Sequence, residues 1–235
     1  MVHAGTSGWA YSSWKPDFYP AKLASAKFLG YYATRLNSVE VNYTFRSFPT
    51  DKLLKGWLDA TPAGFKFAIK AHQSITHVKR LHGTAELVAK FVSSLQPLEK
   101  GGRLGPVLFQ LPPFLKCNVP LLTEFLAGLP GHLRAAFEFR DSSWFTEEVF
   151  VALRKRNCAL CHAESEEIET PAVQTADFFY LRLRKDKYSS KSLREKMQSV
   201  AGLDRQGDVF AYFKHEETPV GASRAEVLLA AINSR

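Results

Sequence analysis

The sequence predicts one closed parallel (β/α)8 barrel of the TIM type, formed as a single domain over residues 1–235. Eight short runs rich in β-branched and aromatic residues alternate with segments of helical periodicity. The length of 235 residues fits one such barrel. No glycine-rich phosphate loop follows any of these runs, which disfavours the alternative of an open, doubly wound sheet.

The eight predicted strands are short apolar runs bounded by polar or turn-forming residues. In chain order they cover residues 2–7, 38–43, 65–70, 106–111, 134–139, 158–163, 179–184 and 209–213.

Helical patterns lie between these strands. Leu87, Phe91 and Leu95 recur at intervals that place them on one apolar helix face. Thr146, followed by two glutamates, is typical of a helix start. The connection after the sixth strand, residues 164–177, is polar and contains a proline, so we expect it to lack a full helix.

Composition excludes several classes of protein. Hydrophobic residues make up 46% of the chain, enough for a large core, so a disordered chain is excluded. No uninterrupted apolar run reaches the length of about 18 residues that a membrane span needs, and the N-terminus lacks the pattern of a signal peptide. The 3 cysteines do not predict a disulfide framework. We therefore expect a cytoplasmic protein with no membrane partner.

The formal net charge of +8 favours anionic partners. These are either a phosphorylated or other anionic small molecule, or nucleic acid. Lysine and arginine are scattered along the chain without a polybasic run, so an ordinary solvated basic surface is the alternative.

Residues 158–162 read CALCH, the spacing that attaches a c-type haem. The segment fits a buried strand, in which successive side chains point to opposite faces. Cys158 and Cys161, three positions apart, would then face opposite ways and could not both reach one porphyrin edge. The sequence therefore predicts a chance match and no haem partner.

Polar side chains occupy positions of the predicted strands that should point into the barrel. Most lie near the C-terminal ends of their strands, the end that carries the active site in barrels of this type. They are Asn42, Lys70, Gln110, Glu138, Arg140, Arg182 and Arg184. Because an unpaired buried charge costs several kcal/mol, such groups are kept only if they are paired or bind a ligand.

This set of side chains suits acid–base chemistry on an anionic substrate. Glu138 is a candidate general acid or base if apolar neighbours raise its pKa, and Glu40 is a second carboxylate. Lys70 is a candidate base if it is desolvated. Arg140 and Arg182 are expected to hold a phosphate or carboxylate in bidentate fashion.

Aromatic residues follow the ends of two predicted strands. The candidates to stack on a sugar or a base are Trp9, Tyr11, Trp14, Trp144 and Phe145. The alternative is that they cap the barrel as part of its core.

Two further interpretations of the barrel mouth remain open. In one, an internal network pairs Glu138 with Arg182 and Glu40 with Lys70 and only fills the mouth. In the other, His162 joins Glu40 and Glu138 in a divalent metal site, although no metal-binding motif is present. The sequence identifies no cofactor.

Six collinear blocks of the sequence resemble domain of unknown function 72, the YecE-like family. The blocks are residues 5–20, 38–45, 65–77, 105–113, 137–145 and 180–184. The resemblance implies a TIM-type barrel, in agreement with the strand count, and no established chemistry. It also implies that the conserved blocks gather at the barrel mouth. Those blocks carry Thr6, Ser7, Glu40, Asn42, Lys70, Thr76, His77, Gln110, Glu138, Arg140 and Trp144.

The chain departs from the usual family pattern on three strands. Arg184 and Lys185 replace a histidine and a glycine, Lys214 and His215 replace two asparagines, and Arg46 replaces a frequent tyrosine. These changes add positive charge to the second, seventh and eighth strands.

Three functional hypotheses follow. The leading one is a protein, either an enzyme or a degenerate enzyme, that binds or transforms a phosphorylated or other anionic small molecule at the barrel mouth. If it is an enzyme, a hydrolase or lyase that uses carboxylate acid–base chemistry fits the residues. The second is a protein that binds or processes nucleic acid, with or without a metal, and the third is a non-catalytic scaffold. The catalytic candidates are Glu138, Glu40 and Lys70. The ligand-binding candidates are Thr6, Ser7, Trp9, Asn42, His77, Gln110, Arg140, Trp144 and Arg182.

Overall fold

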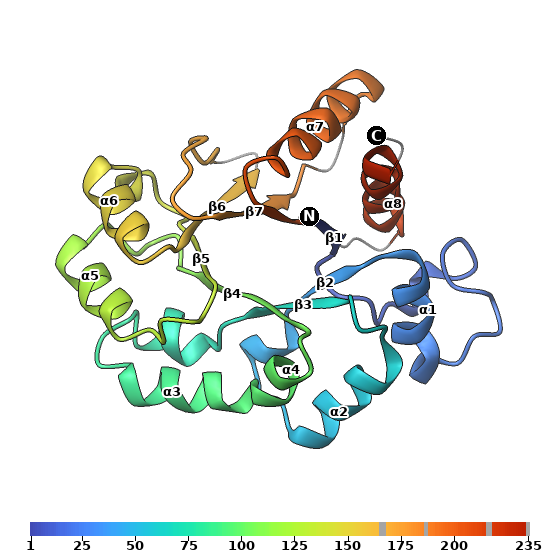
Figure 1. Cartoon of the computed structure of the whole chain (residues 1–235), viewed down its shortest axis with the longest axis horizontal. Coiled ribbons are helices and arrows are strands. Elements are labelled where there is room, and N and C mark those ends of the chain that lie inside the picture. Colours follow the sequence, from blue (N-terminus) through green and yellow to red (C-terminus); the bar gives the residue numbers. More distant parts are fainter. Residues whose placement is uncertain (165–167, 186–187, 215–217, 234–235) are drawn as a thin grey trace.

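Strands form a central barrel and helices surround it in the computed structural model (Figure 1). The structure describes residues 1–164, 168–185, 188–214 and 218–233, and these residues contain eight strands, all parallel to their neighbours. The strands are β1 (Val2–Thr6), β2 (Ser38–Val41), β3 (Lys66–Lys70), β4 (Leu104–Gln110), β5 (Ala135–Glu138), β6 (Ala159–Glu164), β7 (Phe178–Leu183) and β8 (Asp208–Phe213). The predicted TIM-type barrel and all eight predicted strands are confirmed, with small differences at the strand ends.

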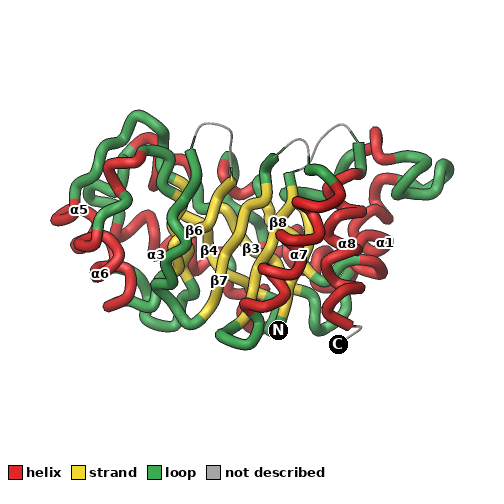
Figure 2. The backbone as a smooth tube through the Cα atoms, turned by 90° about the horizontal axis from the view of Figure 1, so that it is seen from above, coloured by secondary structure: helices red, strands yellow, loops and turns green. Residues whose placement is uncertain are grey.

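The helices pack around the outside of the strands, as the two views show (Figures 1 and 2). They are α1 (Phe28–Arg35), α2 (Asp51–Ala60), α3 (Ala85–Ser94), α4 (Gln96–Lys100), α5 (Val119–Ala127), α6 (Glu147–Lys155), α7 (Ser190–Leu203) and α8 (Val220–Asn233). Between β6 and β7 the described residues 168–177 contain no helix, as predicted for that connection.

Local sequence explains where several helices begin. The side chains of Thr50, Asn118, Thr146 and Ser189 each accept a hydrogen bond from a backbone N–H in the first turn of α2, α5, α6 and α7. The apolar stripe that predicts one helix from Leu87 onward is divided into α3 and α4, because a proline in the first turn starts α4.

The backbone ladder runs from β1 through β8, β7, β6, β5, β4 and β3 to β2. Side chains bridge the remaining seam between β1 and β2. The Asn37 amide accepts from Ala4 N at 2.8 Å and donates to Val2 O at 2.9 Å. The Tyr32 hydroxyl accepts from Thr6 N at 2.9 Å. The barrel therefore closes through side-chain hydrogen bonds at this seam.

The predicted alternation of side chains between the barrel interior and the helix layer is observed. Phe178, Tyr180, Phe210 and Tyr212 fill the interior from β7 and β8, against small residues of β3, β5 and β6. Leu, Val and Phe side chains on the opposite strand faces pack against the helices. This alternation carries the polar side chains near the strand ends inward.

The same alternation tests the facing predicted for the CALCH segment. Cys161 belongs to the interior cluster, whereas Cys158 lies in the layer between strands and helices. The prediction that the two thiols face opposite ways is confirmed.

Candidate functional site

A cavity of about 470 Å³ opens at the C-terminal ends of the strands. All seven polar residues predicted to gather there contribute to its wall: Asn42, Lys70, Gln110, Glu138, Arg140, Arg182 and Arg184. They come from the ends of β2, β3, β4, β5 and β7 or the residues that follow. This cavity is the barrel mouth.

Arg182 lies at the centre of the floor of the mouth and binds two carboxylates. Its Nε and Nη2 donate to Oε2 and Oε1 of Glu40 at 2.9 and 2.7 Å. Its Nη1 donates to Glu138 Oε2 at 2.5 Å. All three side chains are buried, so one guanidinium holds two carboxylates away from water.

Other polar groups complete this cluster. Ser7 Oγ and the Tyr180 hydroxyl donate to Glu40 at 2.7 and 2.9 Å. Arg184 Nη2 donates to Ser7 Oγ at 2.8 Å and to Glu40 Oε1 at 3.2 Å. Gln110 donates to Glu138 Oε1 at 2.9 Å. The predicted pairing of Glu138 with Arg182 is confirmed, but Glu40 binds Arg182 and Arg184 in place of Lys70.

The environment keeps both carboxylates ionised. Burial by itself raises their pKa values, but the guanidinium groups of Arg182 and Arg184 outweigh burial. The pKa of Glu40 falls to about 2, and that of Glu138 falls below its ordinary value. Arginine pairing therefore favours the ionised form of both glutamates, whereas the prediction of Glu138 as a general acid assumes a raised pKa.

Lys70 has the opposite character. Burial, followed by the charge of Arg182, lowers the pKa of the ammonium group to about 8. Its Nζ lies 4.2 Å from the centre of the Phe45 ring, a cation–π contact. Within the described part of the chain Lys70 forms no ion pair, since Arg182 and Arg184 occupy the nearby Glu40.

Among the described residues, the wall of the mouth carries more cationic than carboxylate side chains. Arg46 and Arg140 line it, both exposed, and neither forms an ion pair with any described residue. The second carboxylate in the described wall, Glu164, accepts a hydrogen bond from Tyr188 at 2.5 Å and contacts Lys196. Lys70, Arg46 and Arg140 therefore line the cavity without a carboxylate partner in the part of the chain that the structure describes.

Six of the catalytic and ligand-binding candidates lie outside this wall, and one of them is the fully buried Glu40 described above. Trp144 is fully buried against Phe139, and its indole N–H donates to a backbone oxygen at 2.7 Å, as the alternative of a ring packed into the core predicts. Thr6 and Ser7 are buried and hydrogen-bonded within the protein. His77 lies beside the mouth against Phe45. Trp9 lines a neighbouring cavity.

Several residues of the mouth were absent from the sequence candidates. Tyr180 lies two positions before Arg182 on β7, so the alternation that identifies Arg182 also places Tyr180 inside. Phe45 and Glu164 follow or end strands and had no distinguishing pattern, whereas Tyr11 was among the aromatic residues predicted to follow strand ends.

The metal interpretation on His162, Glu40 and Glu138 is wrong in its geometry. His162 lies on the outer side of β6, where its Nε2 is 3.2 Å from Val173 O. No group of three metal-ligating side chains occurs among the described residues.

None of the described helices is both long enough and apolar enough to cross a membrane. Of the family departures, His215 lies outside the described residues.

Comparison with known proteins gives a family match over nearly the whole chain. The model of a family described as protein of unknown function DUF72 matches residues 3–235. The UPF0759 protein YunF of Bacillus subtilis (strain 168) is 32% identical over 153 residues, which cover 62% of this chain and 53% of YunF. The UPF0759 protein YecE of Escherichia coli (strain K12) is 29% identical over 148 residues, which cover 63% of this chain and 51% of YecE. The chain spans about half the length of these curated relatives.

Solved structures share the barrel. A DUF72 family protein from Thermotoga maritima MSB8 aligns with a TM-score of 0.88 at 26% identity, covering 99% of both chains. A DUF72 family protein from Enterococcus faecalis V583 aligns with a TM-score of 0.83 at 17% identity, covering 99% of this chain and 96% of its own. D-allulose 3-epimerase from Methylomonas sp. aligns with a TM-score of 0.56 at 12% identity over 100% of this chain and 97% of its own, a likeness of fold alone.

Proposed function

The chain belongs to the family of proteins of unknown function DUF72, and we propose that it binds a phosphorylated or other anionic small molecule in its barrel mouth, with Lys70 as the proton-transfer group. One observation carries this proposal: Lys70, Arg46 and Arg140 line the cavity without a carboxylate partner among the described residues. Cations that have no protein partner in a recessed site attract an anion from solution.

The unpaired cations favour a ligand site over a filled scaffold. In a scaffold, internal ion pairs would close the mouth. Here the pairs of Arg182 with Glu40 and Glu138 form the floor, and a cavity of about 470 Å³ lies above it. That volume is within the range of about 300–1,000 Å³ typical of small-molecule sites.

Lys70 is a better proton-transfer group than either glutamate. A general base works best when its pKa lies near the working pH. The pKa of Lys70, lowered by burial to about 8, meets this condition. The pKa of Glu40 does not, because pairing with arginine lowers it to about 2. The proposal therefore moves the acid–base role from the carboxylates to the lysine and leaves Glu40 to position Arg182.

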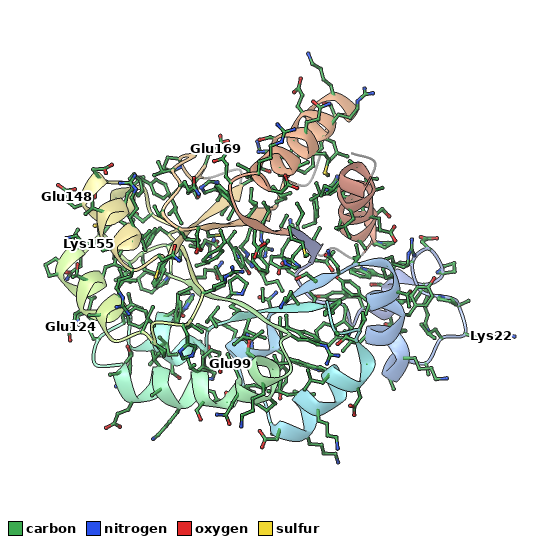
Figure 3. The ribbon with its side chains drawn as sticks, in the orientation of Figure 1. Lys22, Glu99, Glu124, Glu148, Lys155 and Glu169 are labelled. Carbon is green, nitrogen blue, oxygen red and sulfur yellow. The ribbon has the colours of Figure 1, made fainter. Side chains whose placement is uncertain are left out.

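Calorimetric titration with inorganic phosphate and ribose 5-phosphate tests the binding site. We expect Arg140→Ala to weaken binding of either anion by about tenfold, because a charge-assisted hydrogen bond is worth roughly 1.5–3 kcal/mol. Lys22→Ala is the matched control. Lys22 is an exposed cation at the periphery of the molecule (Figure 3), and its substitution removes the same charge as Arg140→Ala.

Equal weakening by Arg140→Ala and Lys22→Ala would attribute the binding to net charge and contradict a site in the mouth. Failure of both anions to bind would also contradict the proposal. Displacement of ribose 5-phosphate from the mouth by short single-stranded DNA would instead favour the nucleic-acid alternative.

The pH dependence tests the role of Lys70. The lysine is charged below pH 8 and neutral above it, so anion affinity should fall as the pH rises through about 8. Lys70→Arg keeps the charge throughout this range, and we expect its anion affinity to be flat between about pH 7 and pH 9. An unchanged pH profile in Lys70→Arg would remove Lys70 from the proposed site.

A further inference from the structure

A second cavity of about 340 Å³ adjoins the mouth on the β1–β2 side. Tyr11 and Asn42 line both cavities, so the two spaces share a wall. The other residues that line the two cavities differ in charge. The mouth is lined by four arginines and a lysine, whereas no charged side chain of the described residues lines the second cavity.

Aromatic rings dominate this second cavity. Trp9, Tyr11, Tyr43 and Trp57 line it. The Trp9 and Trp57 rings meet edge to face, with centroids 5.5 Å apart and an interplanar angle of 89°. Tyr43 keeps 52% of its surface exposed. Large exposed aromatic surface beside a polar cavity is a common feature of sites that stack a planar ring.

Asn42 supplies an unused polar group at the boundary of the two cavities. Its side chain lines both, is half-buried, and forms no hydrogen bond within the described part of the chain. An amide offers a donor and an acceptor, the combination that reads the edge of a heterocyclic ring or the hydroxyls of a sugar. A polar group between an apolar and a charged space matches a ligand that spans both.

We propose that the ligand of the mouth is an anion joined to a planar aromatic ring, of about mononucleotide size, and that the ring lies in the second cavity against Trp9 and Tyr43. This inference rests on the proposed function, since the anionic group occupies the mouth. Asn42 contacts the ligand between its two ends.

Three related probes test the inference: ribose 5-phosphate, adenosine 5′-monophosphate and adenosine. The first carries the anion without a ring, the third carries the ring without an anion, and the second carries both. We expect the monophosphate to bind at least about tenfold more tightly than ribose 5-phosphate, since stacking on an aromatic side chain is worth roughly 1–3 kcal/mol per base. Calorimetry gives the affinities, and quenching of tryptophan fluorescence reports the ring at Trp9.

Substitutions separate the two cavities. Tyr43→Ala and Trp9→Ala should remove most of the advantage of the monophosphate and leave the affinity for ribose 5-phosphate unchanged. Tyr43 is largely exposed, so Tyr43→Ala tests the inference even if Trp9→Ala disturbs folding. Phe114→Ala is the matched control, because Phe114 is a 61% exposed aromatic residue that lines neither cavity.

Equal affinity for ribose 5-phosphate and the monophosphate would overturn the aromatic subsite and leave the anion site in place. An advantage that persists in both Tyr43→Ala and Trp9→Ala would also overturn it. Self-association that depends on Tyr43 would overturn it as well, by assigning this surface to contact between copies of the chain. Failure of both phosphates to bind would contradict the proposed function itself.

Discussion

Arg182 is the residue on which the floor of the mouth depends. Its guanidinium satisfies Glu40 through two hydrogen bonds and Glu138 through a third. Tyr180 and Ser7 fill further acceptor sites on Glu40, so the buried charges are both paired and hydrogen-bonded. Such a cluster is costly to break, because the loss of one partner leaves an uncompensated buried charge.

Glu40→Gln should show this cost and its pH dependence. The pKa of Glu40 is about 2 in the folded protein against an ordinary value of 4.5, so its stabilisation is full above pH 4.5 and is lost as the pH falls from 4.5 to 2. We expect the variant to lose roughly 3–5 kcal/mol of unfolding free energy at neutral pH. The difference from the parent should narrow on acidification through that window.

Urea denaturation at a series of pH values between neutral and the onset of acid unfolding measures this difference. Glu124→Gln is the control, since Glu124 is an exposed carboxylate on α5 (Figure 3). A Glu40→Gln protein as stable as the parent at neutral pH would show that the buried cluster contributes nothing to folding.

Lys70→Met should act in the opposite direction. Burial lowers the folded pKa of Lys70 from 10.5 to about 8, so keeping the lysine charged costs stability below pH 8, and this cost disappears as the pH rises from 8 to 10.5. We expect the variant to gain on the order of 1–2 kcal/mol at pH 7 after allowance for solvent screening, or about 2–4 °C in Tm per kcal/mol.

The gain in Lys70→Met should shrink between about pH 8 and pH 10, with Lys22→Met as the control of equal charge. A lower Tm at pH 7 would mean that the contact of Lys70 with the Phe45 ring outweighs desolvation of the ammonium.

At the scale of elements, β1 and β2 approach each other so closely at their seam that Gly5 has no room for a side chain. A Cβ atom added to Gly5 would lie 1.9 Å from Ser38 O and 2.6 Å from the Tyr32 hydroxyl. Gly5→Ala should therefore push the two strands apart and cost about 1–3 kcal/mol or more. It should also weaken the Tyr32 hydrogen bonds to Thr6 and Ser38.

Gly56→Ala makes the matched comparison. Gly56 is exposed in the middle of α2, and nothing lies within 4 Å of an added Cβ. We expect this change to stabilise the protein by about 0.5–1 kcal/mol, because alanine favours the helix. Urea denaturation of both variants should give opposite signs, and two changes of the same sign would contradict the steric account of the seam.

The strands show which features of the site could be predicted from the sequence. Alternation within each strand predicts a facing, which placed Lys70, Glu138 and Arg182 inside the barrel. Alternation does not predict a partner across the barrel, so the expected pair of Glu40 with Lys70 was wrong. Trp144 shows a related limit, because a tryptophan after a strand end has the same local pattern whether it caps the core or reaches a ligand.

At the scale of the whole molecule, the net charge of +8 is a poor guide to the binding surface. Figure 3 labels Lys22, Lys155, Glu99, Glu124, Glu148 and Glu169, exposed charged side chains of both signs on several helices and loops. The proposal therefore depends on the few cations that line the mouth and not on the total charge. A polyanion that reads the whole surface would bind with a steep dependence on salt concentration.

The backbone ladder pairs the first strand of the chain with the last, and this pairing predicts how the barrel unfolds. β1 pairs with β8 over five residues, and the Met1 amino group contacts Asp208 at 3.1 Å. Because each strand pairs with a neighbour and the order runs around the barrel, no set of consecutive strands has its own closed core. We therefore expect residues 1–235 to unfold as one cooperative unit, as the prediction of a single domain requires.

Chemical denaturation followed by two signals tests this expectation. Far-ultraviolet circular dichroism reports the helices, and fluorescence reports the 4 tryptophans, of which Trp14 and Trp144 are fully buried and far apart in the sequence. Coincident curves, and ladder amides of β1 and β8 that exchange only through global unfolding, are the expected result. If Trp14→Phe and Trp144→Phe proteins gave fluorescence midpoints that differed from each other but circular dichroism midpoints equal to the parent, the two halves would be unfolding separately. The barrel would then consist of two weakly coupled parts, and the seam at Gly5 would be the first place to look for the division.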